Sequence, residues 1–93
     1  MLPKIIDYLK DKSVLILGFG REGQSTLSYI KKHLPEKELT VADKNKVTAD
    51  GENIRTVCGE NYLDCVNDFD VVMKSPGISF RDVEVNENTE VTC

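Results

Sequence analysis

A glycine-rich segment that joins a strand to a helix constrains the fold of this chain more than any other feature. Residues 18–23 read G-F-G-R-E-G and fit the pattern G-x-G-x-x-G. The apolar run Ser13–Leu17 directly before it predicts a strand that is buried on both faces. After it, apolar residues recur at spacings of three and four and predict a helix over Glu22–Leu34. This succession is typical of the first unit of a nucleotide-binding parallel sheet.

The segments that follow continue the same alternation of strands and helices. Leu39–Ala42 predicts a second strand, Ile54–Cys58 a third and Asp70–Lys74 a fourth. A short helical turn over Tyr62–Asn67 is expected between the third and fourth strands. The pattern predicts an α/β fold with a Rossmann-like, doubly wound parallel sheet and right-handed crossovers.

The two ends of the chain add one element each. Met1–Lys10 predicts a short amphipathic helix that packs on a sheet edge, and Val91–Cys93 reads as the start of a fifth strand. Ninety-three residues suffice for one domain with one core, so 1–93 is taken as a single small domain. Because the alternation of strands and helices stops at the start of this fifth strand, we expect a fragment of a longer protein.

The composition excludes several classes of function. Twelve Lys and Arg against sixteen Asp and Glu give a net charge of −4, which argues against a broad basic face for nucleic acid. The longest apolar runs are a few residues, too short to span a bilayer, so no membrane association and a cytoplasmic location are expected.

The reactive side chains give no catalytic or metal site. Cys58, Cys65 and Cys93 show no C-x-x-C spacing, so we expect no zinc site and reduced, partly buried thiols. The solitary His33 stands in the last turn of a predicted helix and is interpreted as structural. The pattern G-x-x-x-x-G-K-[ST] is absent, and no catalytic residue is proposed.

Each glycine of the motif has a separate predicted task. Gly18 permits a tight turn, Gly20 lets a ligand approach the backbone, and Gly23 lets the helix lie close to the strand. The free N–H groups of the first helical turn then favour a phosphate above Gly20. The alternative is that the glycines serve only to pack the helix on the strand.

Polar residues after the second strand form another candidate group. Asp43 lies twenty residues beyond Gly23, where nucleotide-binding folds place an acceptor for nucleoside hydroxyls. Lys44 and Asn45 follow and could reach a base or ribose. For each of the three, a solvated surface position is the alternative.

A second bend follows the fourth strand, at the same predicted edge of the sheet. Ser75 supplies a hydroxyl, Pro76 fixes φ, and Gly77 admits a close approach of the backbone. An ordinary turn is the alternative. Arg21 and Lys74 are the cations nearest the predicted anion, although either could be a solvated surface charge.

Four stretches of the sequence together resemble a known family. Gly18–Ser25 (GFGREGQS), Asp43, Gly59 and Val71–Ile78 (VVMKSPGI) are similar to the N-terminal domain of the Mur ligases. Within that family the likeness is to members that add D-glutamate to UDP-N-acetylmuramoyl-L-alanine (UDP-MurNAc-L-alanine).

The resemblance implies a three-domain, cytoplasmic and monomeric enzyme of peptidoglycan synthesis. Such ligases use ATP and Mg²⁺, bound outside this domain, to form an acyl phosphate that the D-glutamate amine attacks. The N-terminal domain holds the UDP part of the substrate, so the isolated chain is expected to bind without turnover and to need no cofactor itself. The implied UDP-binding positions are Gly18, Gly20, Arg21, Glu22, Gly23, Asp43, Lys44, Asn45, Ser75, Pro76 and Gly77.

Two other readings of the same motif remain open. A regulatory domain that senses NAD(H), as in potassium-transport systems, shares the glycine loop and the acidic strand end but does not require Ser75–Gly77. A fragment of an NAD(P)-dependent dehydrogenase shares the loop, but no segment resembling a catalytic one follows it here.

Overall fold

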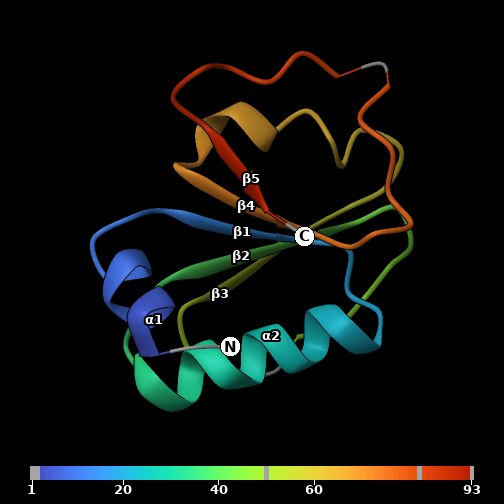
Figure 1. Cartoon of the computed structure of the whole chain (residues 1–93). Coiled ribbons are helices and arrows are strands. Elements are labelled where there is room, and N and C mark those ends of the chain that lie inside the picture. The colour runs from blue at the N-terminus through green and yellow to red at the C-terminus, as the bar shows by residue number, and fades with distance from the viewer. Residues whose placement is uncertain (1–2, 50, 82, 93) are drawn as a thin grey trace.

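The protein is built on a five-stranded parallel sheet with strand order β3-β2-β1-β4-β5 (Figure 1). The computed structural model describes residues 3–49, 51–81 and 83–92. Every neighbouring pair of strands is parallel, which confirms the predicted α/β fold with a doubly wound sheet. The elements are α1 (Pro3–Leu9), β1 (Val14–Leu17), α2 (Arg21–His33), β2 (Leu39–Asp43), β3 (Ile54–Cys58), a 3₁₀ helix (Val66–Asp68), β4 (Val71–Lys74) and β5 (Glu90–Thr92).

Alternate residues of the strands build two separate cores, one on each face of the sheet. On one face, Val14 and Ile16 of β1 pack with α1 and α2. On the other, Leu15 and Leu17 pack with the β3–β4 connection and the segment that follows β4. Figure 1 shows α1 and α2 on one side of the sheet and these two segments, which include the 3₁₀ helix, on the other. The burial of all of β1 explains its continuous apolar sequence.

Two predicted details need correction. The first helix packs on the face of the sheet and not on its edge, because Leu9 joins the same core as Val14 and Val71. Between β3 and β4, successive turns lead into the 3₁₀ helix Val66–Asp68, in place of a helical turn over Tyr62–Asn67. Short polar side chains in this connection favour turns over regular helix. Met1, Leu2 and Cys93, which the predicted end elements included, lie outside the described residues.

Side chains fasten the edge of the sheet at which the strands begin. The Ser13 N–H donates to the Asp70 carboxylate (3.0 Å), while the Asp70 N–H donates to the Ser13 hydroxyl (2.8 Å). This reciprocal pair joins the starts of β1 and β4. The Lys37 ammonium donates to the carbonyls of Lys10 (3.4 Å) and Lys12 (2.5 Å), and so ties the turn after α2 to the turn after α1.

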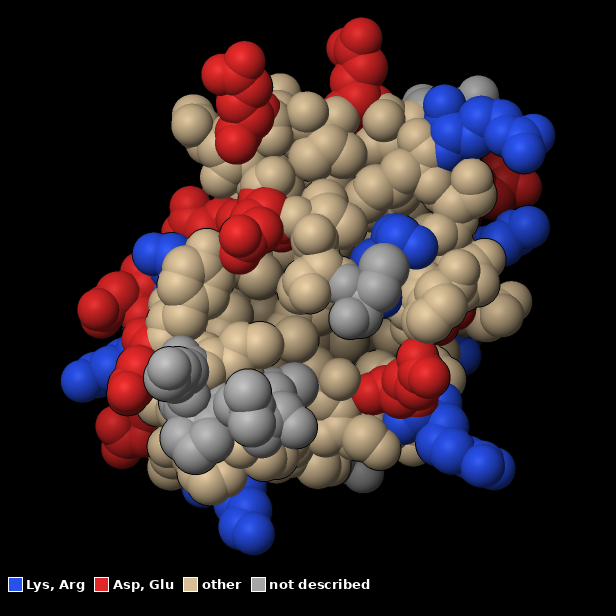
Figure 2. Space-filling model, viewed as in Figure 1, with Lys and Arg blue, Asp and Glu red and all other residues tan. Residues whose placement is uncertain are grey.

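The surface carries both signs of charge. On the side seen in Figure 2, acidic and basic side chains alternate around the periphery without forming a continuous basic area. Among the helices of the described residues, none has the length and apolar character needed to cross a membrane.

Candidate functional site

The two predicted bends meet at the edge where the strands end. β1 and β4 are neighbours with Leu17 opposite Lys74, so both strands finish at the same level. The Ser75 N–H continues the ladder and donates to the Leu17 carbonyl (2.9 Å), which places the Ser-Pro-Gly bend directly beside Gly18. The strand order reverses between β1 and β4, the position at which sheets of this kind bind their ligands.

Gly18 and Gly23 are required by close contacts within the site. Gly18 has a φ of +91°, and a Cβ there would lie 2.6 Å from the Ser75 hydroxyl oxygen. A Cβ on Gly23 would overlap the carbonyl oxygen of Gly18. Both observations agree with the tasks predicted from the motif: a tight turn and a close approach of α2 to β1. The Ser75 hydroxyl lies 3.5 Å from the same Gly18 carbonyl oxygen, the limit of hydrogen bonding.

Gly20, in contrast, leaves open space at the start of α2. No atom lies within 4 Å of where its Cβ would stand. Gly20 is the N-cap of α2, and no side chain caps the helix there. The exposed positive end of the helix dipole at this point suits an anionic group.

Asp43 fastens two loops together. One carboxylate oxygen accepts the Phe19 N–H (2.8 Å) from the glycine loop, and the other accepts the Asn45 N–H (2.8 Å) from the loop after β2. The prediction placed Asp43 correctly beside the glycine loop but gave it only a ligand contact. The structure adds a positioning role, and each oxygen retains a further lone pair for a ligand.

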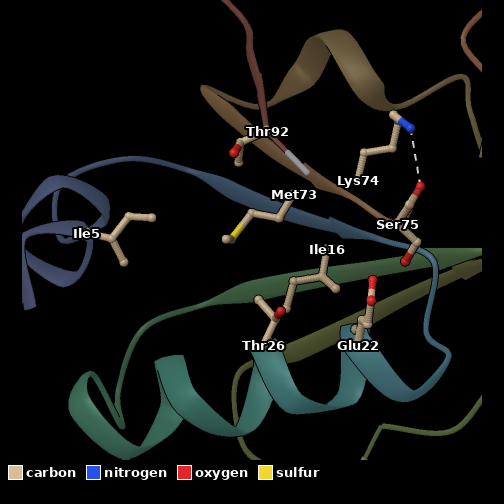
Figure 3. Close-up of a pocket in the computed structure, with 9 residues that line it drawn as sticks. Ile5, Ile16, Glu22, Thr26, Met73, Lys74, Ser75 and Thr92 are labelled. Atoms are coloured by element: carbon tan, nitrogen blue, oxygen red, sulfur yellow. Dashed lines mark hydrogen bonds between the residues drawn. The ribbon is translucent and has the colours of Figure 1, made fainter. Parts of the chain in front are cut away.

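A crevice of about 300 Å³ opens on the α1 and α2 face, between α2 and β4 (Figure 3). Three of the implied UDP-binding residues, Glu22, Gly23 and Ser75, line it. Sequence reasoning missed Thr26, although it stands one helical turn after Glu22, a spacing that places both on one side of α2. The other lining residues come from four elements: Ile5, Ile16, Met73, Lys74 and Thr92.

Lys74 was predicted to lie near the anion, but its ammonium turns to the opposite face of the sheet. It donates to the carbonyls of Ser75 (3.2 Å) and Ile78 (2.7 Å), and it lies 5.8 Å from the centre of the Phe80 ring. Ile78 and Phe80 pack in the core on the far side from α2. Lys74 therefore stabilises the Ser-Pro-Gly bend from the face of the sheet opposite α2.

The remaining predicted side chains do not converge on the crevice. Arg21 lies on the outer side of α2 in a shallow hollow that it shares with Lys32. Lys44 is exposed and lines another hollow, near Cys58. The Asn45 side chain, Pro76 and Gly77 are exposed at the same edge of the sheet.

The thiols and the histidine have no shared site among the described residues, where no group of three or more His, Cys, Asp or Glu could hold a metal ion. Cys58 is exposed, which corrects the expectation of a partly buried thiol, whereas Cys65 is half-buried. Burial raises the pKa of the Cys65 thiol above its usual range. His33 is exposed, and its ring lies 4.6 Å from that of Tyr29.

Comparison with known families identifies this arrangement. Residues 12–92 match the family described as "Mur ligase MurD-like, N-terminal domain". The chain belongs to the MurD-like family of Mur ligase N-terminal domains. The match includes both bends of the site and all five strands, and it confirms the resemblance predicted from the glycine loop and the Ser-Pro-Gly bend.

Curated relatives of this MurD-like domain carry ligase names. It is 31% identical over 90 residues (89% of the chain) to the UDP-N-acetylmuramoylalanine–D-glutamate ligase of Ligilactobacillus salivarius, and 31% identical over 107 residues (99% of the chain) to that of Acetivibrio thermocellus. It is 33% identical over 78 residues (80% of the chain) to the UDP-N-acetylmuramoyl-L-alanine–L-glutamate ligase of Xanthomonas campestris. The chain spans only 19%, 22% and 17% of these proteins, respectively. No solved structure matches it at a comparable level of significance.

Proposed function

We propose that this domain binds the UDP part of UDP-MurNAc-L-alanine for an ATP-dependent ligase that adds D-glutamate during peptidoglycan synthesis. The observation that carries the proposal is the meeting of the glycine loop and the Ser-Pro-Gly bend above the uncapped start of α2. Two neighbouring bends at the point where the strand order reverses suit a long ligand with a pyrophosphate at its centre.

The names of the relatives support the nucleotide substrate more firmly than the amino acid. Both classes of ligase name UDP-N-acetylmuramoylalanine, and they differ in whether D-glutamate or L-glutamate is joined to it. We assign D-glutamate because the relative matched over 99% of the chain carries that name. The amino acid itself would be bound by parts of the ligase beyond this domain.

In this proposal the chain binds and orients the substrate but performs no chemical step. The backbone N–H groups at the start of α2 hold the pyrophosphate, and the Asp43 carboxylate keeps the glycine loop in place through the Phe19 N–H. Lys44, Asn45 and the Asp43 lone pairs are available to the nucleoside.

ATP and Mg²⁺ would activate the substrate carboxylate elsewhere in a monomeric, cytoplasmic enzyme. Among the described residues no group of three or more His, Cys, Asp or Glu could hold a metal ion, so the ligation of Mg²⁺ is assigned to parts of the ligase beyond this domain.

The proposal is tested by following backbone amide resonances during titration of the chain. UDP and UDP-MurNAc-L-alanine should shift the amides of residues 20–23 and 75–77 more than NADH does. A matched control is uridine, which lacks the pyrophosphate and should shift the first group less. Shifts with NADH alone would favour the NAD(H)-sensing alternative and contradict the proposal.

A further inference from the structure

The outer side of β5 carries backbone groups that the sheet does not use. β5 stands at one end of the strand order, so among the described residues only β4 pairs with it (Figure 1). In a parallel pair, alternate residues of one strand bond to its neighbour. The Glu90 N–H donates to the Asp70 carbonyl, so Glu90 and Thr92 face β4. The N–H and the carbonyl of Val91 therefore point to the outer side, where a further strand could pair with them.

A hollow of about 200 Å³ lies beside the outer side of β5, on the face of the sheet that carries α1. Its apolar lining comes from Ile5 and Leu9 of α1 and from Val71 and Met73 of β4. Figure 3 shows the Met73 side chain turned toward Ile5. The lining also includes Val91, whose side chain packs in the core on the opposite face. The hollow therefore reaches the backbone of β5.

An exposed aromatic ring, that of Tyr8, borders the same hollow. Tyr8 is 43% exposed, and among the described residues it is the one large hydrophobic side chain classed as exposed. A single exposed ring on a surface is ordinary and needs no explanation. This ring, however, lies next to both an apolar hollow and free backbone groups. Tyrosine at such a position buries much apolar area on contact while its hydroxyl stays hydrogen-bonded.

The charge around the hollow is negative. Among the described residues that line it, Glu90 alone is charged. A hydrogen bond to Glu90, then desolvation and the charges of Glu90 and Asp70, raise the pKa of the Tyr8 phenol above its usual 10.0. Lys12 offsets part of this charge, because its ammonium lies 4.8 Å from the centre of the Tyr8 ring. Two carboxylates against one ammonium favour a basic group on a partner.

These features together specify what could bind. Val91 offers one donor and one acceptor, which cannot hold a strand alone, because each hydrogen bond contributes about 1 kcal/mol net. The remaining stabilisation must come from side chains of the added strand that lie on the α1 face. One of them would enter the hollow and must be apolar. The next on that face is two residues away and lies near Glu90, where a basic side chain is favoured.

A second copy of this chain fits the outer side of β5 less well than a basic strand does. On its own β5, Glu90 and Thr92 are the side chains on the α1 face, since Val91 packs on the opposite face. Neither of them would fill an apolar hollow. Pairing two copies would also bring together chains that each have a net charge of −4.

We propose that the outer side of β5 binds an extended, basic segment of a partner protein, which adds to the sheet as a further strand and places an apolar side chain in the hollow beside α1. In this mode of recognition, backbone hydrogen bonds contribute affinity and a side-chain pocket contributes specificity. The inference does not depend on the proposed function, because the UDP site is proposed at the ends of β1, β2 and β4.

The test titrates the chain with an acetylated and amidated peptide, Thr-Lys-Val-Leu-Thr, whose lysine and leucine lie on one face of a strand. Millimolar peptide should shift the amides of Tyr8 and Val91 and slow hydrogen exchange at Val91, while the Gly20 amide stays unshifted. The matched control is Thr-Glu-Val-Leu-Thr, which should bind several-fold more weakly because its glutamate is repelled by Glu90. An unshifted Val91 amide with the lysine peptide, or equal binding of the two peptides, would overturn the inference.

Val91→Pro tests the backbone pairing. The substitution removes the N–H on the outer side of β5 and leaves the bonds to β4 in place. Thr56→Pro is the matched control on β3, at the other end of the strand order: the Leu39 N–H donates to the Asn53 carbonyl, so alternation directs the Thr56 N–H outward. The peptide shift at Tyr8 should be lost in Val91→Pro and kept in Thr56→Pro. An undiminished shift in Val91→Pro would show that no added strand forms.

Glu90→Lys tests the charge preference and keeps the inference falsifiable if Val91→Pro does not fold. The variant should bind the glutamate peptide more tightly than the lysine peptide, a reversal of the order in the natural chain. An unchanged order would contradict the role of Glu90 and the assignment of a basic partner. In the absence of peptide, exchange at Val91 that slows as the protein concentration rises would assign the outer side of β5 to a second copy and overturn the inference.

Discussion

The two edges of the sheet are held together in different ways. At the edge where strands begin, side chains bridge separate segments: Ser13 and Asp70 bond reciprocally, and Lys37 spans two turns. At the edge where strands end, glycine contacts and the Asp43 carboxylate shape the bends, and the space above Gly20 is left open. One edge is thus cross-linked by side chains that favour stability, whereas the other leaves open space above Gly20, where we propose that the ligand binds.

The largest effect is expected at Gly23. In Gly23→Ala the new methyl group would overlap the Gly18 carbonyl oxygen, so α2 must move away from β1. We expect a loss of about 3 kcal/mol or more in the free energy of unfolding, measured by urea denaturation.

Gly20→Ala is the matched control for this substitution. Its methyl group meets no atom within 4 Å, so the loss of stability should stay below about 1 kcal/mol, the cost of a poorer N-cap. Binding of UDP should weaken, because the methyl group would stand where the phosphate approaches. Equal destabilisation by the two variants would contradict the division between the edges.

Asp43→Ala should have the next largest effect, and chiefly on binding. It removes the acceptor for the Phe19 and Asn45 N–H groups, so the glycine loop loses its attachment to β2. We expect UDP affinity to fall by about 1–3 kcal/mol, measured by titration calorimetry. Asp43→Asn keeps one acceptor oxygen, so its affinity for UDP should lie between that of the natural chain and that of Asp43→Ala. An unchanged dissociation constant in Asp43→Ala would show that Asp43 does not contribute to the site.

Ser13→Ala tests the opposite edge. The Asp70 N–H would lose its bond to the Ser13 hydroxyl, at a cost of about 1 kcal/mol in the free energy of unfolding. The affinity for UDP should not change, because the substitution lies at the far end of β1 from the glycine loop. A weaker UDP complex in Ser13→Ala would show that the two edges are coupled.

The smallest expected effect concerns Lys37 and pH. Desolvation lowers the pKa of the Lys37 ammonium from its usual 10.5, while Asp11 and Asp70 oppose the shift. The unfolded chain therefore binds more protons at pH values just below 10.5, and stability due to this group rises with pH in that window. Lys37→Met should flatten this part of the stability curve slightly, since Lys37 is only partly buried and solvent screens its charge. A steeper rise in the variant would contradict the assignment.

Local signals in the sequence predicted most of the fold and part of the site. The glycine motif with its flanking strand and helix located Gly18 and Gly23 correctly, because their tasks depend on neighbours in the chain. The hydrogen bond from the Phe19 N–H to the Asp43 carboxylate was not predicted. The two residues are far apart in sequence, and no local pattern indicates the direction in which a loop N–H points. The orientation of Lys74 follows from strand alternation, which places it on the same face as Val72.

One backbone oxygen, the carbonyl of Gly18, faces both Gly23 of α2 and the hydroxyl of Ser75. Neither the glycine loop nor the Ser-Pro-Gly bend can shift far without disturbing that shared atom, so the two behave as a single unit. Engineering a new ligand preference into this scaffold therefore requires paired redesign of both loops. A glycine loop grafted from another family without a matching Ser-Pro-Gly bend would lack the contacts that join the two.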